Sequence, residues 1–294
     1  MAEIDKLLKD YLDYLEIEKN RSPKTRENYE RYLKVFLNYS RIKSPAAIND
    51  DLVRQFRIHL ARQNTKKITQ SYYIIALRNF LKYLIKRDFK VLSPDRIELP
   101  RVSRRQIDLV EYEELERLLA APKGQDLRSL RDRAILETFF STGLRLSELC
   151  ALNRQIDLKR GELSIRGKGD KLRLVFLSDS AKKAIKNYLD KRNDPEEPLF
   201  VSLTKGNAAL GRITTRAVQR LIERYGRKAG ITKRVHPHAL RHSFATDLLI
   251  NGADLRSVQE LLGHSNISTT QVYTHLTNKE LREIHRAFHA RRRT

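Results

Sequence analysis

The 294-residue chain carries a formal net charge of +23 and has an isoelectric point near 10.2. This excess of Lys and Arg, present in both halves of the chain, predicts a polyanionic partner, because neutralising phosphates releases condensed counterions. A hydrophobic fraction of 40% excludes wholesale disorder, and the single Cys150 excludes an internal disulfide or a cysteine-rich zinc site. Neither a signal peptide nor a membrane-spanning stretch is evident, so we expect a soluble cytoplasmic protein that does not engage a membrane.

The first part of the chain, residues 1–92, predicts a small all-α domain. Apolar and aromatic residues recur at helical spacing in four segments, at about 3–17, 23–37, 49–63 and 69–87. Ser22-Pro23 suits the start of the second helix, as an N-cap followed by proline at the first helical position. Residues 93–107 lack periodicity and hold two prolines and four arginines. They predict a linker that follows a DNA backbone.

The remainder, residues 108–294, predicts an α+β domain, so the chain is mainly α with a small β-sheet. Residues 162–166 and 171–177 suit strands, and Gly167-Lys-Gly-Asp170 between them indicates a hairpin. Gly143 is expected to end the helix before it. The predicted helices cover about 111–121, 129–141, 180–192, 214–229, 238–250, 254–262, 268–275 and, as an amphipathic last segment, 278–290.

Polar residues near the C-terminus are the first candidates for chemistry. His238 and Arg241 lie three residues apart and so share a helix face. On a basic protein such a face is usually only solvated. His264 follows Gly263, which is expected to end a helix, so this histidine could simply interact with the last carbonyls. Tyr273 could be an aromatic anchor on the core, the common fate of tyrosine.

Two upstream residues complete the set. Arg145 comes just after the helix that Gly143 ends, and it could be a surface arginine paired with Glu148. Lys168 lies at the tip of the predicted hairpin, where a solvated turn lysine is the ordinary outcome. Each feature is weak by itself. Their order along the chain is what makes them specific.

The order Arg145, hairpin Lys168, His238-x-x-Arg241, Gly263-His264 and Tyr273 resembles the tyrosine recombinase (phage integrase) family. The resemblance covers essentially the whole chain, and its compact plan is similar to the Xer-type recombinases. It implies a two-domain DNA clamp. Residues 1–92 would form the helical, SAM-like core-binding domain and 108–294 the catalytic domain, with 278–290 as a C-terminal exchange helix.

The resemblance also implies a role for each candidate. Tyr273 would attack the scissile phosphate and form a 3′-phosphotyrosyl bond. Arg145 and Arg241 would hold the non-bridging oxygens, and His238 and His264 would hydrogen-bond the phosphate.

Lys168 would protonate the 5′-oxygen as general acid. Lys171 competes for this role, although the glycines that flank Lys168 favour the latter. Arginines and lysine supply the positive charge, so neither a metal ion nor another cofactor is expected.

The resemblance implies double-stranded DNA as substrate and four protomers on two duplexes, working through a Holliday junction. The assembly would be a homotetramer, or a heterotetramer with a second recombinase, and a DNA translocase is a possible further partner. Residues 278–290 could pack on a neighbouring protomer or on their own domain. Resolution of chromosome or plasmid dimers is the first expectation. The alternatives are integration of a mobile element, topoisomerase-like nicking and resealing, and DNA binding without catalysis.

Overall fold

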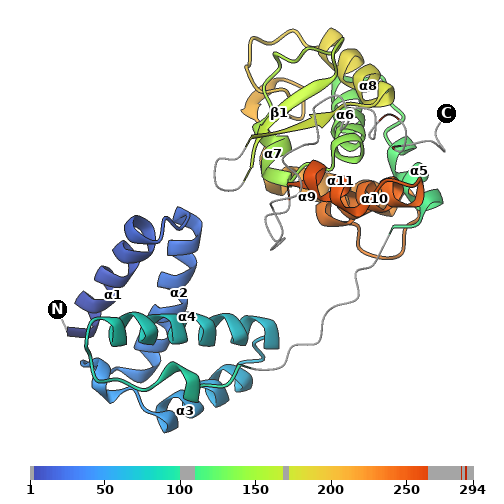
Figure 1. Ribbon diagram of the computed structural model, residues 1–294. Helices are drawn as coiled ribbons and strands as arrows, with labels where there is room; N and C mark the ends of the chain where they lie inside the picture. The colour runs from blue at the N-terminus through green and yellow to red at the C-terminus, as the bar shows by residue number, and fades with distance from the viewer. Residues whose placement is uncertain (1–2, 100–109, 168–171, 264–285, 287–288, 290–294) are drawn as a thin grey trace. The chain divides into compact units, whose positions relative to one another are not determined.

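The computed structural model describes residues 3–99, 110–167, 172–263, 286 and 289 (Figure 1). The chain divides into two compact units, Met1–Arg105 and Gln106–Thr294. The predicted fold class is confirmed, since helices dominate and the described strands form two antiparallel hairpins. In the described part of the chain, no helix combines the length and the apolar character needed to cross a membrane.

The described part of the first unit contains four α-helices, all at positions that the periodicity predicts. They are α1 (Glu3–Asp13), which continues into a π-helical turn (Tyr14–Glu18), α2 (Pro23–Ser40), α3 (Asp50–Arg62) and α4 (Lys67–Lys86). The hydroxyl of Ser22 accepts a hydrogen bond from the Thr25 amide, and the side chain of Asn49 accepts one from Leu52. These N-caps satisfy amides that the first turn of each helix leaves unpaired.

Aromatic side chains fill the core of the first unit. The ring of Tyr11 lies 5.2 Å from the ring of Phe80 and 5.2 Å from that of Tyr83. Phe36 of α2 meets Phe56 of α3 edge-on at 5.1 Å. Such tilted and edge-on pairs add to the stabilisation that apolar burial provides. The helical periodicity of the sequence thus corresponds to one continuous apolar core.

The start of the predicted linker is packed onto this first unit. Residues Pro94–Arg96 form a short 3₁₀ turn, and Ile97 is buried. The guanidinium of Arg78 donates a hydrogen bond to the carbonyl of Ile97 at 3.0 Å. A single apolar anchor has no periodicity, which is why the sequence pattern does not distinguish Ile97 from a linker residue. The rest of the predicted linker, from residue 100 on, lies outside the described residues.

The described part of the second unit combines helices with two hairpins. In chain order its elements are α5 (Tyr112–Ala120), α6 (Leu127–Thr142), α7 (Leu146–Ala151), β1 (Glu162–Arg166), β2 (Leu172–Phe176), α8 (Asp179–Asp190), β3 (Val201–Leu203), β4 (Ala209–Arg212), α9 (Thr215–Lys228), α10 (Pro237–Ile250) and α11 (Leu255–Leu262). The β1–β2 hairpin is the predicted one. The sequence patterns predict neither α7 nor the β3–β4 hairpin, because these elements are too short to show a period.

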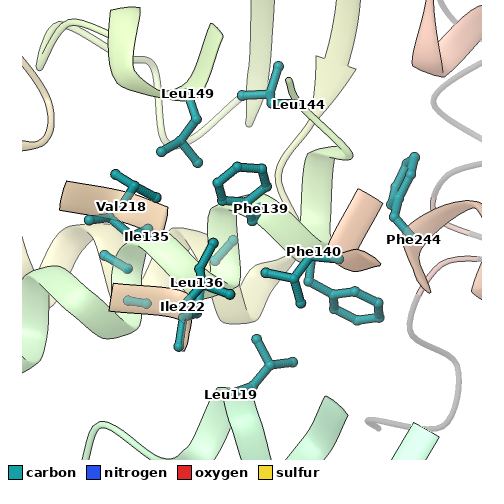
Figure 2. Packing of buried hydrophobic residues seen from close by; sticks show 14 of the residues in the cluster. Leu119, Ile135, Leu136, Phe139, Phe140, Leu144, Leu149, Val218, Ile222 and Phe244 are labelled. Atoms are coloured by element: carbon teal, nitrogen blue, oxygen red, sulfur yellow. The ribbon is translucent and has the colours of Figure 1, made fainter. Parts of the chain in front are cut away.

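Helix α6 runs through the middle of the second unit (Figure 1). Nearly every residue from Leu130 to Thr142 is buried, as expected of a helix that is covered on all sides. Phe139 and Phe140 lie among side chains of α7, α9 and α10, which include Leu149, Val218, Ile222 and Phe244 (Figure 2). The end of α6 is therefore held firmly in place, and the candidate site begins there.

Candidate active site

Two glycines end the helices that meet at the candidate site. Gly143 follows α6 with φ +58°, and Gly263 follows α11 with φ +62°. Both residues have the left-handed conformation that glycine adopts most easily, so both predicted helix ends are confirmed. Arg145 comes two residues after the first of these turns, at the N-cap position of α7.

Arg145 is anchored at three points. Its Nη1 donates to Oε1 of Glu148 at 2.8 Å, and its amide donates to Oε2 at 2.7 Å. Its Nη2 donates to the carbonyl of Gly263 at 2.7 Å. The pairing with Glu148 that the sequence suggested as a purely structural alternative is thus present. It coexists with a contact to the end of α11, and the side chain stays 30% exposed.

Arg241 of α10 is buried and reaches the same place. Its Nη1 donates to the carbonyl of Gly143 and its Nη2 to the carbonyl of Leu262, both at 2.5 Å. Burial, together with the charges of Arg145 and Arg173, lowers the pKa of this guanidinium to about 10. The group therefore remains charged at neutral pH, and among the described residues no carboxylate forms an ion pair with it.

Arg173 is a part of the site that sequence reasoning missed. Its Nη1 and Nη2 donate to the two oxygens of Glu148 at 3.0 and 2.6 Å, and its Nε donates to the carbonyl of Leu261 at 3.1 Å. Burial would raise the pKa of Glu148, but hydrogen bonds from Arg173 and Arg145 outweigh it and lower that pKa to about 2. Glu148 is therefore a firmly ionised acceptor.

The three arginines share one feature, the C-terminal turn of α11. Three consecutive carbonyls, of Leu261, Leu262 and Gly263, each accept from a different guanidinium. A helix C-terminus carries partial negative charge and has carbonyls without intrahelical partners, so cations are stabilised there. The described part of the site thus holds three positive charges against the one carboxylate of Glu148. This local excess of positive charge suits an anion.

His238 lies in the first turn of α10 and is exposed. Arg241 is buried, so the two side chains differ in exposure, although their spacing of three residues predicts a shared helix face. The neighbouring His236 is the N-cap of α10, where its Nδ1 accepts a hydrogen bond from the Ala239 amide at 3.1 Å. Across the described parts of the chain, no three His, Cys, Asp or Glu side chains gather as metal ligands would.

The other candidates, Lys168, His264 and Tyr273, lie outside the described residues, as do the competing Lys171 and the helix predicted at 268–275. The structure does describe the elements next to Lys168 and His264. Strand β1 ends at Arg166, which pairs with Leu172 at the start of β2. Gly263 directly precedes the predicted histidine.

Of the predicted exchange helix 278–290, only residues 286 and 289 are described. The ring of His289 lies 4.8 Å from that of Phe140 and 5.1 Å from that of Phe244. Its Nδ1 lies 3.2 Å from Oδ2 of Asp247. This one residue therefore packs on its own domain. Asp247 of α10 therefore has a partner near the end of the chain.

Family comparison gives the class of the protein. Residues 109–280 match the phage integrase family, and residues 8–88 match the phage integrase N-terminal SAM-like domain. The chain belongs to the phage integrase family and is a tyrosine recombinase, a site-specific recombination enzyme, as the order of its polar residues indicates.

Relatives narrow the comparison to Xer recombinases. The chain is 39% identical to the tyrosine recombinase XerC of Halalkalibacterium halodurans, with 98% of each chain covered. It is 37% identical to the tyrosine recombinase XerD of Oceanobacillus iheyensis, with 97% of this chain and 98% of the relative covered.

Solved structures agree on the fold. The XerH site-specific recombinase bound to its difH substrate in a pre-cleavage complex superposes with a TM-score of 0.67 at 25% identity, covering 94% of this chain and 82% of that one. A lambda integrase dimer bound to a COC′ core site gives a TM-score of 0.68 at 18% identity, covering 90% of this chain and 96% of that one, and this second likeness concerns the fold alone.

Proposed function

We propose that this tyrosine recombinase binds a specific double-stranded DNA site and breaks one strand by transferring the scissile phosphate to Tyr273. The observation that supports this most directly is the meeting of Arg145 and Arg241 at the end of α11, from two elements far apart in the sequence. Both guanidiniums are fixed by main-chain carbonyls, so they stay in place without a bound anion. A phosphodiester would supply the negative charge that this cluster lacks.

The arginines act on the charge of the transition state. A guanidinium presents planar, parallel donors that match two oxygens of a phosphate. As the phenol oxygen attacks, the non-bridging oxygens gain charge, and donors already in place stabilise them without reorganisation. Removing one such donor typically lowers the rate by about 10²–10³-fold. Arg145 is the more exposed of the two and would contact the phosphate most directly.

Proton transfers complete the reaction. The bond from phosphorus to the Tyr273 oxygen forms while the bond to the 5′-oxygen breaks. Tyr273 loses its phenol proton, for which His238 is an acceptor candidate, and Lys168 gives a proton to the leaving 5′-oxygen. His264 would hydrogen-bond the phosphate. The phosphotyrosyl bond conserves the energy of the phosphodiester, so a second strand can attack it without ATP.

The two units would share the work of holding DNA. The helical first unit would bind the outer part of the site and the second unit the scissile region, as the two arms of a clamp. Similarity to XerC and XerD proteins over nearly the whole chain favours resolution of chromosome or plasmid dimers over integration of a mobile element. Recombination would involve four protomers on two duplexes and a Holliday junction, with or without a second recombinase and a translocase.

The test is covalent capture on DNA. A binding site is first selected from random duplexes, and a nicked suicide duplex carrying it is incubated with the protein and run on a denaturing gel. We expect a covalent protein–DNA band with the wild type and with Tyr72→Phe, a control at an exposed tyrosine of the first unit. Tyr273→Phe should give none. A band that persists in Tyr273→Phe would refute the assignment of the nucleophile.

A further inference from the structure

Arg173 is a further charged residue of the site, and its guanidinium is bound to the carboxylate of Glu148 and to the carbonyl of Leu261. We infer that Arg173 is a positioning residue for Arg145: it holds the Glu148 carboxylate and the end of α11 in the relation that aims the Arg145 guanidinium. This inference rests on the proposed function, in which Arg145 binds the scissile phosphate.

The contacts of Arg173 and Arg145 interlock on one carboxylate. Oε1 of Glu148 accepts from Nη1 of both arginines, and Oε2 accepts from Nη2 of Arg173 and from the Arg145 amide. Arg173 therefore fixes the rotation of the carboxylate, and the carboxylate fixes Arg145. The side chains of Arg173 and Glu148 are 8% and 7% exposed, so water competes little for these bonds.

The second anchor of Arg145 depends on Arg173 as well. Arg145 donates to the carbonyl of Gly263, and Arg173 donates to the carbonyl of Leu261 in the same turn. Arg173 thus spans both supports of Arg145, the carboxylate on α7 and the last turn of α11. It reaches them from β2, where it pairs with Ile165 across the hairpin.

Close approach at Gly263 is an independent sign of this arrangement. A Cβ at residue 263 would lie 2.9 Å from Cδ of Arg173 and 3.2 Å from its Nη1. A side chain at residue 263 would displace the Arg173 side chain from the path by which its guanidinium reaches Glu148 past the helix end. The left-handed turn at Gly263 therefore serves both to end α11 and to admit Arg173.

Exposure separates Arg173 from Arg145. The side chain of Arg145 is 30% exposed and can meet a phosphate, whereas that of Arg173 is 8% exposed and donates through Nε, Nη1 and Nη2 to the Leu261 carbonyl and the Glu148 carboxylate. Lysine at 173 would keep the charge. It would lose the planar fork that grips the two Glu148 oxygens and the Leu261 carbonyl at once.

The experiment compares two suicide duplexes that differ at the scissile phosphate. One carries the ordinary phosphodiester, and the other a methylphosphonate, in which a methyl group replaces one non-bridging oxygen and removes the charge. A guanidinium that neutralises charge matters less on the neutral substrate. Arg145→Ala should therefore be strongly defective on the first duplex and close to wild type on the second.

We expect Arg173→Lys and Arg173→Gln to follow the same pattern. Each should cleave the phosphodiester about 10–100-fold more slowly, a smaller loss than the roughly 10²–10³-fold that removal of a preorganised donor causes, because Arg145 itself stays in place; each should recover most of the rate on the methylphosphonate. In an Arg145→Ala background, Arg173→Lys should add less than about a threefold loss, since residues that act as a unit are not additive.

Arg212→Lys is the matched control for a merely structural arginine. Arg212 also grips main-chain carbonyls, of Cys150 and Leu152, but it does not contact Glu148. Any defect of Arg212→Lys should be equal on the two duplexes. Equal defects of the Arg173 variants on both duplexes, or wild-type rates on the phosphodiester, would overturn the inference. If Arg145→Ala is itself not rescued by the neutral substrate, or the wild type does not cleave, the proposed function fails first and the inference falls with it.

Discussion

Replacing Gly143 with alanine tests how tightly the end of α6 is fitted to the site. The residue has φ +58°, in the left-handed region that side chains disfavour. A Cβ there would lie 2.4 Å from Cδ1 and 2.8 Å from Cε1 of Phe244. That ring is buried against the core, so it cannot turn aside at low cost (Figure 2). Gly143→Ala therefore combines backbone strain with overpacking.

The two costs can be separated with Gly230, which has φ +72° and nothing within 4 Å of a built Cβ. Strain alone should lower the free energy of unfolding of Gly230→Ala by about 1–2 kcal/mol. Overpacking adds about 1–3 kcal/mol, so Gly143→Ala should lose about 2–5 kcal/mol. For a domain of this size each kcal/mol lowers Tm by about 2–4 °C. We expect losses of about 2–8 °C and about 4–20 °C respectively.

Thermal unfolding followed by far-UV circular dichroism is the suitable assay, because the chain has no tryptophan. Covalent capture on the suicide duplex gives a second readout. The carbonyl of Gly143 accepts from Arg241, so Gly143→Ala should also slow cleavage while Gly230→Ala does not. Equal Tm losses in the two variants would refute the argument, since they would show that the Phe244 ring yields freely.

The depressed pKa of Glu148 predicts that the free energy of unfolding depends on pH. The contribution of the ionised carboxylate to this free energy is complete above the unfolded pKa of about 4.5 and is lost as pH falls toward about 2. The shift corresponds to about 3 kcal/mol, and urea titrations should show that Glu148→Gln lacks this part of the acid dependence. Burial raises the pKa of the Cys150 thiol to about 11, so iodoacetamide at mildly alkaline pH should label it only after urea unfolds the chain; rapid labelling of native protein, detected by mass spectrometry, would contradict this. Ser22→Ala should lower the stability of the first unit by about 1 kcal/mol through loss of the α2 N-cap and leave the cleavage rate per folded molecule unchanged, as urea unfolding and covalent capture can show.

Long helices were predictable because their signals are local. Apolar periodicity, Ser22 as a cap and the glycines at 143 and 263 act within a few residues of themselves, and the structure confirms each. The β3–β4 hairpin was not predicted, because a three-residue strand is too short to show an alternation of apolar and polar residues.

The site was predictable only in part, because its geometry depends on contacts between distant elements. The order of the candidates led to Arg145 and Arg241, and the structure brings these two together. Arg173 looked like an ordinary strand residue, since its partners lie on α7 and α11. The contact of Asp247 with His289 was equally invisible from the sequence of α10. The roles of Lys168, His264 and Tyr273 stay predictions.

The use of main-chain carbonyls as anchors has a consequence for how this enzyme tolerates mutation. A substitution at Leu261 or Leu262 changes a side chain of the apolar core but deletes no acceptor, because every residue type carries the same carbonyl. The support of the arginines is encoded in the path of the backbone and not in the identity of these residues. Sequence drift along α11 can therefore repack the core while the arginines keep their acceptors, provided that the turn at Gly263 keeps its shape.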